Sequence, residues 1–90
     1  MKDPIYHACQ LAAYGIYGAG GDETPEQQDF GADCIEAAII LWRQTAHAVE
    51  NEPPEKLRVC GEFFTEDELV DKVAEMRRKA ESLRAEKKNN

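Results

Sequence analysis

The chain has few of the residues from which active sites and metal sites are usually built. Its 90 residues include 2 histidines, 3 cysteines and a single serine, Ser82. The C-x-x-C spacing typical of zinc sites is missing, and neither histidine has a serine beside it. Since no nucleophile can be paired with a base, we predict a protein that is not an enzyme and that uses no metal and no cofactor.

The chain also lacks a long apolar run. No stretch approaches the roughly 18 apolar residues of a membrane span, and Met1-Lys-Asp-Pro4 does not open a signal peptide. An odd number of cysteines without a secretory signal favours reduced thiols over a disulfide framework. We therefore expect a cytoplasmic protein with one helical domain, residues 1–90, and a frayed C-terminus.

Basic residues are scarce in the first two-thirds of the chain. Residues 1–63 contain 11 acidic and 4 basic side chains, whereas residues 64–90 contain 7 of each. Because phosphate binding needs a basic surface, this balance argues against direct binding of nucleic acid or of an anionic membrane. It favours another protein with a basic surface as the partner.

One segment, residues 25–51, is apolar enough to form a central helix. The capping box Thr24-Pro-Glu-Gln27 begins it, and Pro53 and Pro54 end it. Its apolar residues cover roughly 200° of a helical wheel, twice the stripe of a surface helix, so the helix needs packing partners on two sides. This arc contains Phe30, Cys34, Ile35, Ala37, Ala38, Ile39, Leu41, Trp42, Ala46, Ala48 and Val49.

Two further helices are predicted on either side of the central one in sequence. Asp3 and Pro4 begin the first, which covers about residues 4–17 and is ended by glycine. The capping box Thr65-Glu-Asp-Glu68, preceded by an aromatic residue that can pack on the first turns, begins the third over residues 66–88. The fold class is therefore all-α, a small bundle of three principal helices.

The segment between the second and third helices permits two interpretations. Leu57 and Cys60 are three residues apart, so a helical turn from Pro54 to Gly61 would place them on one face. The alternation in Lys56-Leu-Arg-Val-Cys60 would equally suit an extended segment. Because no partner strand is evident, we predict a short helical turn near residues 54–60.

The glycine-rich segment 15–22 does not match a phosphate-binding loop. It lacks the Gly-Lys-Ser/Thr sequence, runs into Asp22 and Glu23, and follows a predicted helix instead of a strand. We interpret it as a helix terminus and turn.

The third helix has an apolar seam that suits self-association. Its apolar residues alternate at spacings of four and three, as in a coiled coil, and Val70 widens the seam near its start. We therefore expect a homo-oligomer, a dimer, through Leu69, Val73, Met76, Ala80 and Leu83.

A partner-binding surface is expected on the acidic part of the chain. Ile40 lies in the polar arc of the central helix and is either a scattered exposed residue or part of a contact surface. Glu36, Arg43 and His47 share that arc; they would suit a general base, but the same set is typical of a solvated helix face. The candidate partner-binding residues are Tyr14, Tyr17, Asp22, Glu23, Glu26, Asp29, Asp33, Glu36, Ile40, Arg43 and His47.

These features favour a non-enzymatic helical interaction protein that binds a basic partner surface, with nucleic-acid mimicry as one mode. In size, acidity and absence of motifs the chain resembles small accessory and inhibitor proteins of phages and mobile elements, a likeness of type that no motif carries. Two alternatives remain open. One is a self-assembling scaffold joined through the 66–88 seam. The other is a small-ligand or nucleotide binder that uses Tyr6, Tyr14, Tyr17 and the glycine turn, with Arg43 as an anion partner.

Overall fold

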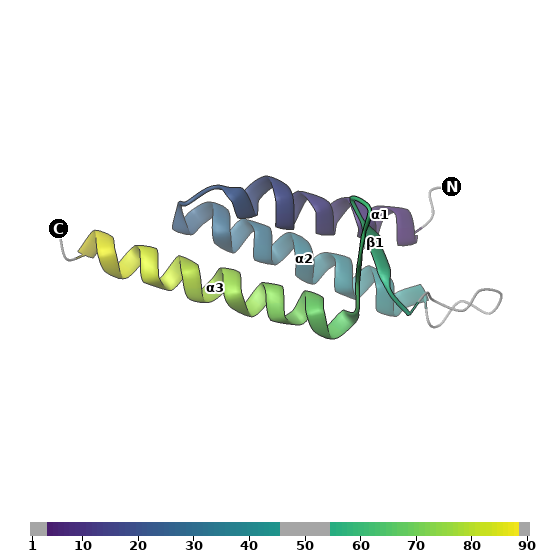
Figure 1. Cartoon of the computed structure of the whole chain (residues 1–90). Helices are drawn as coiled ribbons and strands as arrows, with labels where there is room; N and C mark the ends of the chain where they lie inside the picture. Colours follow the sequence, from purple (N-terminus) through teal and green to yellow (C-terminus); the bar gives the residue numbers. More distant parts are fainter. Residues whose placement is uncertain (1–3, 46–54, 89–90) are drawn as a thin grey trace.

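The structure is a computed structural model that describes residues 4–45 and 55–88. Three helices lie side by side along one direction: α1 (Pro4–Ala13), α2 (Pro25–Thr45) and α3 (Glu66–Lys88) (Figure 1). The middle helix, α2, packs against both α1 and α3. A hairpin of two short strands, β1 (Leu57–Val59) and β2 (Glu62–Phe64), leads into α3, and β1 also packs on α1. The predicted all-α bundle of three principal helices is confirmed, with this small sheet added.

The α2 helix begins at the predicted capping box. The backbone N–H of Gln27 donates to Thr24 Oγ1 over 3.3 Å. The predicted arc is wrong at one edge, because Phe30 is 46% exposed while the polar Gln28 is buried. Gln28 Nε2 donates to the carbonyls of Gly20 (3.0 Å) and Asp22 (2.6 Å), so burial leaves this amide hydrogen-bonded. The predicted end of this helix, residues 46–51, lies outside the described residues.

Helical backbone continues four residues beyond the predicted end of the first helix. After α1 comes a π-helical turn, η1 (Tyr14–Gly18), and then a 3-10 turn, η2 (Ala19–Gly21). The glycines therefore lie within the helical path and do not stop it at residue 17. They are tolerated there because the segment packs against α2.

The predicted short helical turn near residues 54–60 is wrong. Residues 57–59 form a strand that pairs with the next strand, β2, after a turn of two residues. Leu57 is paired with Phe64, and Val59 is paired with Glu62. Cys60 and Gly61 have φ angles of 51° and 86°, the positive values that a two-residue type I′ hairpin turn requires. Leu57 and Val59 are fully buried, so the alternation in this segment was the two-residue period of a strand. Pro54 lies outside the described residues.

The α3 helix begins at its predicted capping box and extends past the other helices. The Thr65 N–H donates to Glu68 Oε1 (3.0 Å), and the Glu68 N–H donates to Thr65 Oγ1 (3.2 Å). Phe64 and Leu69, on either side of this cap, are both buried in the main core. The C-terminal end of α3 projects beyond the start of α2 (Figure 1), and the molecule measures 55 × 21 × 18 Å.

Candidate functional site

The apolar seam predicted for self-association faces the interior of the chain. Leu69, Met76 and Ala80 are buried, and Val73 packs against the same core. Leu83, near the projecting end of α3, is half-buried. A dimer through this seam would therefore require α3 to leave α2.

Three of the predicted acidic residues of α2, Asp29, Asp33 and Glu36, are bound by arginines of α3. The Arg77 guanidinium lies between three carboxylates: its Nη1 is 3.5 Å from Asp29, its Nη2 is 2.8 Å from Asp33, and its Nε is 3.1 Å from Glu36. These hydrogen bonds, first to Asp33 and then to Glu36, raise the pKa of Arg77 well above its usual value. Arg84 binds Asp29 as well. This row of acids therefore joins two helices of one chain.

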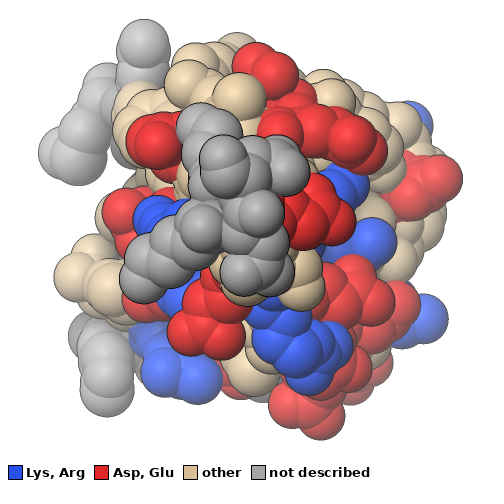
Figure 2. Space-filling view, turned by 90° about the vertical axis from the view of Figure 1, so that its left-hand side faces the viewer, with Lys and Arg blue, Asp and Glu red and all other residues tan. Residues whose placement is uncertain are grey.

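The surface charge is mixed as a consequence. Lys79 Nζ lies 3.4 Å from Glu23, and Arg43 binds Glu66. Figure 2 looks at the end where α3 projects, and acidic and basic side chains are interspersed there. The acidic part of the sequence does not form a uniform acidic surface on this end of the molecule.

The predicted tyrosines contact different elements. Tyr14 packs edge-to-face on Phe30 of α2, with ring centroids 5.7 Å apart. Tyr17 instead donates its hydroxyl to Glu62 of β2 over 2.9 Å, and this hydrogen bond raises the pKa of Tyr17. Tyr6 accepts a hydrogen bond from Gln10 on its own helix. All three tyrosines are about half exposed, and each contacts a different element: Tyr6 contacts α1, Tyr14 contacts α2 and Tyr17 contacts β2.

The glycine turn lies beside a small hollow of about 230 Å³, lined by Ile16, Gly20, Gln28, Lys72, Glu75, Met76 and Lys79. Its lysines already have acidic partners, since Lys72 Nζ is 3.7 Å from Glu75 and Lys79 pairs with Glu23. The tyrosines of the ligand-binding alternative do not line it. That alternative gains no support from this hollow.

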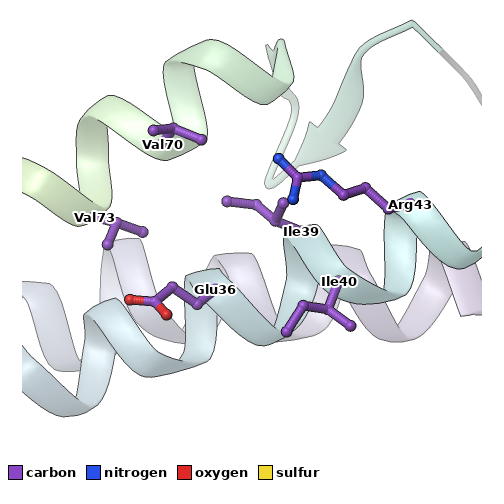
Figure 3. Close-up of a pocket in the computed structure, with 6 residues that line it drawn as sticks. All are labelled: Glu36, Ile39, Ile40, Arg43, Val70 and Val73. Atoms are coloured by element: carbon purple, nitrogen blue, oxygen red, sulfur yellow. The ribbon is translucent and has the colours of Figure 1, made fainter.

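A groove between α2 and α3 brings Ile40 together with apolar residues of α3 (Figure 3). The buried Ile39 and the half-buried Val73 form its floor. Ile40 and Val70 stand at its rims, 55% and 44% exposed. The groove has a volume of about 350 Å³ and is lined by Glu36, Ile39, Ile40, Arg43, Val70 and Val73.

The two charged residues of the groove lie at its opposite ends and are held by α3. Glu36 accepts hydrogen bonds from Arg77, and Arg43 binds Glu66. Three predicted partner-binding residues, Glu36, Ile40 and Arg43, therefore meet in one groove, whereas His47 lies outside the described residues. The sequence did not indicate that Val70 would line the same groove as Ile40, because its spacing only widened the seam of α3.

The described residues offer little for chemistry. Within residues 4–45 and 55–88, no three His, Cys, Asp or Glu side chains gather as they would around a metal ion. The Cys34 thiol is buried, and burial raises its pKa and so disfavours the reactive thiolate. In the same part of the chain, no helix combines the length and apolar character needed to cross a membrane.

The chain was also compared with protein-family models, curated proteins and solved structures, and none of them matches it.

Proposed function

We propose that this protein is a non-enzymatic α-helical interaction protein, and that it binds a partner protein through the groove between α2 and α3. The observation that carries the proposal is the pair of half-exposed apolar side chains, Ile40 of α2 and Val70 of α3, that line one groove together with the buried Ile39. Apolar side chains that are contiguous on a surface, and rimmed by charges such as Glu36 and Arg43, are typical of protein–protein contact sites.

The dimensions of the molecule are compatible with such an interface. A stable protein–protein contact covers about 800 Å² on each partner. The long face of this chain measures about 55 by 21 Å, which leaves room for that area around the groove. Cys34 and Cys60 are reduced thiols, which suits a reducing compartment such as the cytoplasm.

A basic partner surface remains part of the proposal. The net charge of −7 attracts basic proteins and speeds their association. Nucleic-acid mimicry receives less support, because a mimic presents a row of free carboxylates, whereas Asp29, Asp33 and Glu36 are bound to Arg77. A protein of this kind acts by occupying a surface of its partner, as accessory and inhibitory proteins do.

Affinity purification from the native cell tests the proposal. The tagged chain, its Ile40→Gln variant and a Phe63→Thr variant are compared, with the captured proteins quantified by mass spectrometry. Phe63 is 61% exposed on β2 and does not line the groove, so it is the matched control. We expect Ile40→Gln to lose a basic protein that Phe63→Thr retains. A set of captured proteins that is the same for all three chains would contradict the proposal.

A further inference from the structure

Resting on the proposed function, we infer that the occupant of the α2/α3 groove is an amphipathic α-helix of the partner, with Lys or Arg beside its apolar face. Three properties of the groove carry this inference: its direction and length, its openness, and the sign of the charge around it.

The groove has the direction and length that suit a helix. The end of α2 meets the start of α3 through Arg43 and Glu66, while Asp29 near the start of α2 meets Arg84, so the two helices run antiparallel. A third helix can pack along the furrow between them, as α1 already packs on the other side of α2. Glu36 and Arg43 are seven residues apart, about 10 Å or two helical turns. Two turns accept apolar side chains at positions i, i+3 or i+4, and i+7 of a docked helix.

The groove is too open for a small molecule. Sites for small ligands cover about 70–90% of the ligand surface. Here Ile39 is buried, while the rim residues Ile40 and Val70 are themselves about half exposed. Such a furrow covers one face of a side chain and leaves the opposite side open, as a helix lying on the surface requires.

The charges around the groove favour a basic helix. The groove residues Glu36 and Arg43 belong to ion pairs that contain three acids, Asp33, Glu36 and Glu66, but only two bases, Arg43 and Arg77, which leaves one net negative charge. Lysines or arginines on a docked helix would meet the remaining negative charge. A second copy of this chain would instead bring the same acids and another charge of −7, which opposes self-association on this face.

Designed peptides and the purified full-length chain test this inference. One peptide of about 18 residues carries leucines at i, i+3, i+4 and i+7 spacing with lysines on both flanks. A second has the same leucines with glutamates in place of the lysines. Binding is measured by fluorescence anisotropy of the labelled peptides at low and high salt. We expect the lysine peptide to bind at least about tenfold more tightly than the glutamate peptide, and this preference to shrink at high salt.

Substitutions at the rim locate the peptide. Ile40→Gln and Val70→Gln keep good helix formers on the surface, and each should weaken binding of the lysine peptide by about tenfold. The Phe63→Thr control should bind like the wild type. Equal binding of both peptides, no binding of either, or binding that both rim variants retain would overturn the inference. Sedimentation of the chain alone is the remaining check. A dimer that dissociates in the Ile40→Gln variant would show that the groove binds a second copy of this chain.

The outcomes separate this inference from the proposed function. If neither peptide binds but Ile40→Gln still loses its cellular partner, the groove binds a protein that is not a basic helix. If the lysine peptide binds but cellular capture does not depend on Ile40, the groove can bind a basic helix, but the proposed function of the groove in the cell is contradicted.

Discussion

The backbones of Gly15 and Gly31 cross so closely that neither residue has room for a side-chain carbon. A Cβ atom on Gly15 would lie 2.5 Å from the carbonyl oxygen of Gly31 and 2.7 Å from Cγ1 of Ile35. A Cβ atom on Gly31 would lie 2.9 Å from the carbonyl oxygen of Gly15 and 2.4 Å from Cε of Met76. This crossing sets how η1, and with it α1, lies on α2.

The crossing predicts that Gly15→Ala destabilises the protein although alanine is the better helix former. The added methyl group would meet backbone atoms that cannot move independently, so the free energy of unfolding should fall by about 1–3 kcal/mol. For a domain of this size each kcal/mol corresponds to about 4–8 °C in Tm. Gly21→Ala is the matched control, because nothing lies within 4 Å of its added carbon. Urea titration measures both, and equal stabilities would contradict the packing described.

The hairpin turn predicts that Cys60→Asn stabilises the protein. Cys60 has a φ of 51°, a left-handed conformation that asparagine adopts more readily than cysteine. We expect the free energy of unfolding to rise by up to about 1 kcal/mol in thermal and urea denaturation. Gly61→Ala should instead lower it by about 1 kcal/mol or more, because its φ is 86°. A Cys60→Asn variant that is less stable than the wild type would show that the left-handed conformation of Cys60 does not reduce the stability of the protein.

The cluster around Arg77 predicts a stability difference that depends on salt. Arg77→Met keeps most of the apolar stem but leaves Asp29, Asp33 and Glu36 facing one another without a cation. Because these pairs are partly exposed, we expect a loss of about 1 kcal/mol at low salt. The loss should be smaller in about 1 M salt, where the Debye length is about 3 Å. Arg78→Met, at the exposed neighbouring position, removes the same charge and is the control. If both variants lose the same stability, the three carboxylates around Arg77 do not add to its contribution.

The hydrogen bonds between Thr65 and Glu68 at the start of α3 predict that the free energy of unfolding depends on pH in the acid range. The pKa of Glu68 is lowered in the folded state, first by the hydrogen bond from the Thr65 backbone N–H and then by that from its hydroxyl. A lowered pKa contributes stability that is present above the ordinary value of 4.5 and is lost as the pH falls through the folded-state value. The difference in unfolding free energy between wild type and Glu68→Gln should therefore shrink as the pH falls below about 4.5. Urea titrations across this range measure it. Glu86→Gln, near the far end of α3, is the control, and parallel curves for all three chains would contradict the assignment.

The helix starts could be predicted because their signals are local. Thr24 and Thr65 cap backbone N–H groups only three residues away, so the capping boxes are complete within one short stretch of sequence. The hairpin was also local, with Cys60 and Gly61 between two strands. It was missed because cysteine at the first turn position is not the Asn or Asp that usually indicates a type I′ turn.

The partners of the charged residues could not be predicted in the same way. Arg77 lies in the middle of α3 and is more than 40 residues from Asp33 and Glu36, so no local pattern pairs it with them. The excess of acidic residues in the first two-thirds of the chain is a property of the sequence. The acidic surface inferred from it assumed that these acids would not pair with the bases of the last third. Packing α3 along α2 brought them together.

The amino-acid sequence by itself determined where the three principal helices begin, that α2 needs cover on two sides, and that the chain is acidic. Those properties follow from residues that are close in sequence and from the number of charged residues. Neither requires knowledge of how the helices pack. Only the tertiary structure decided that the seam of α3 is used within the chain and that Ile40 and Val70 line one groove. The reason is geometric: a groove depends on the rotation and spacing of two helices, which here follow from distant contacts such as Met76 on Gly31.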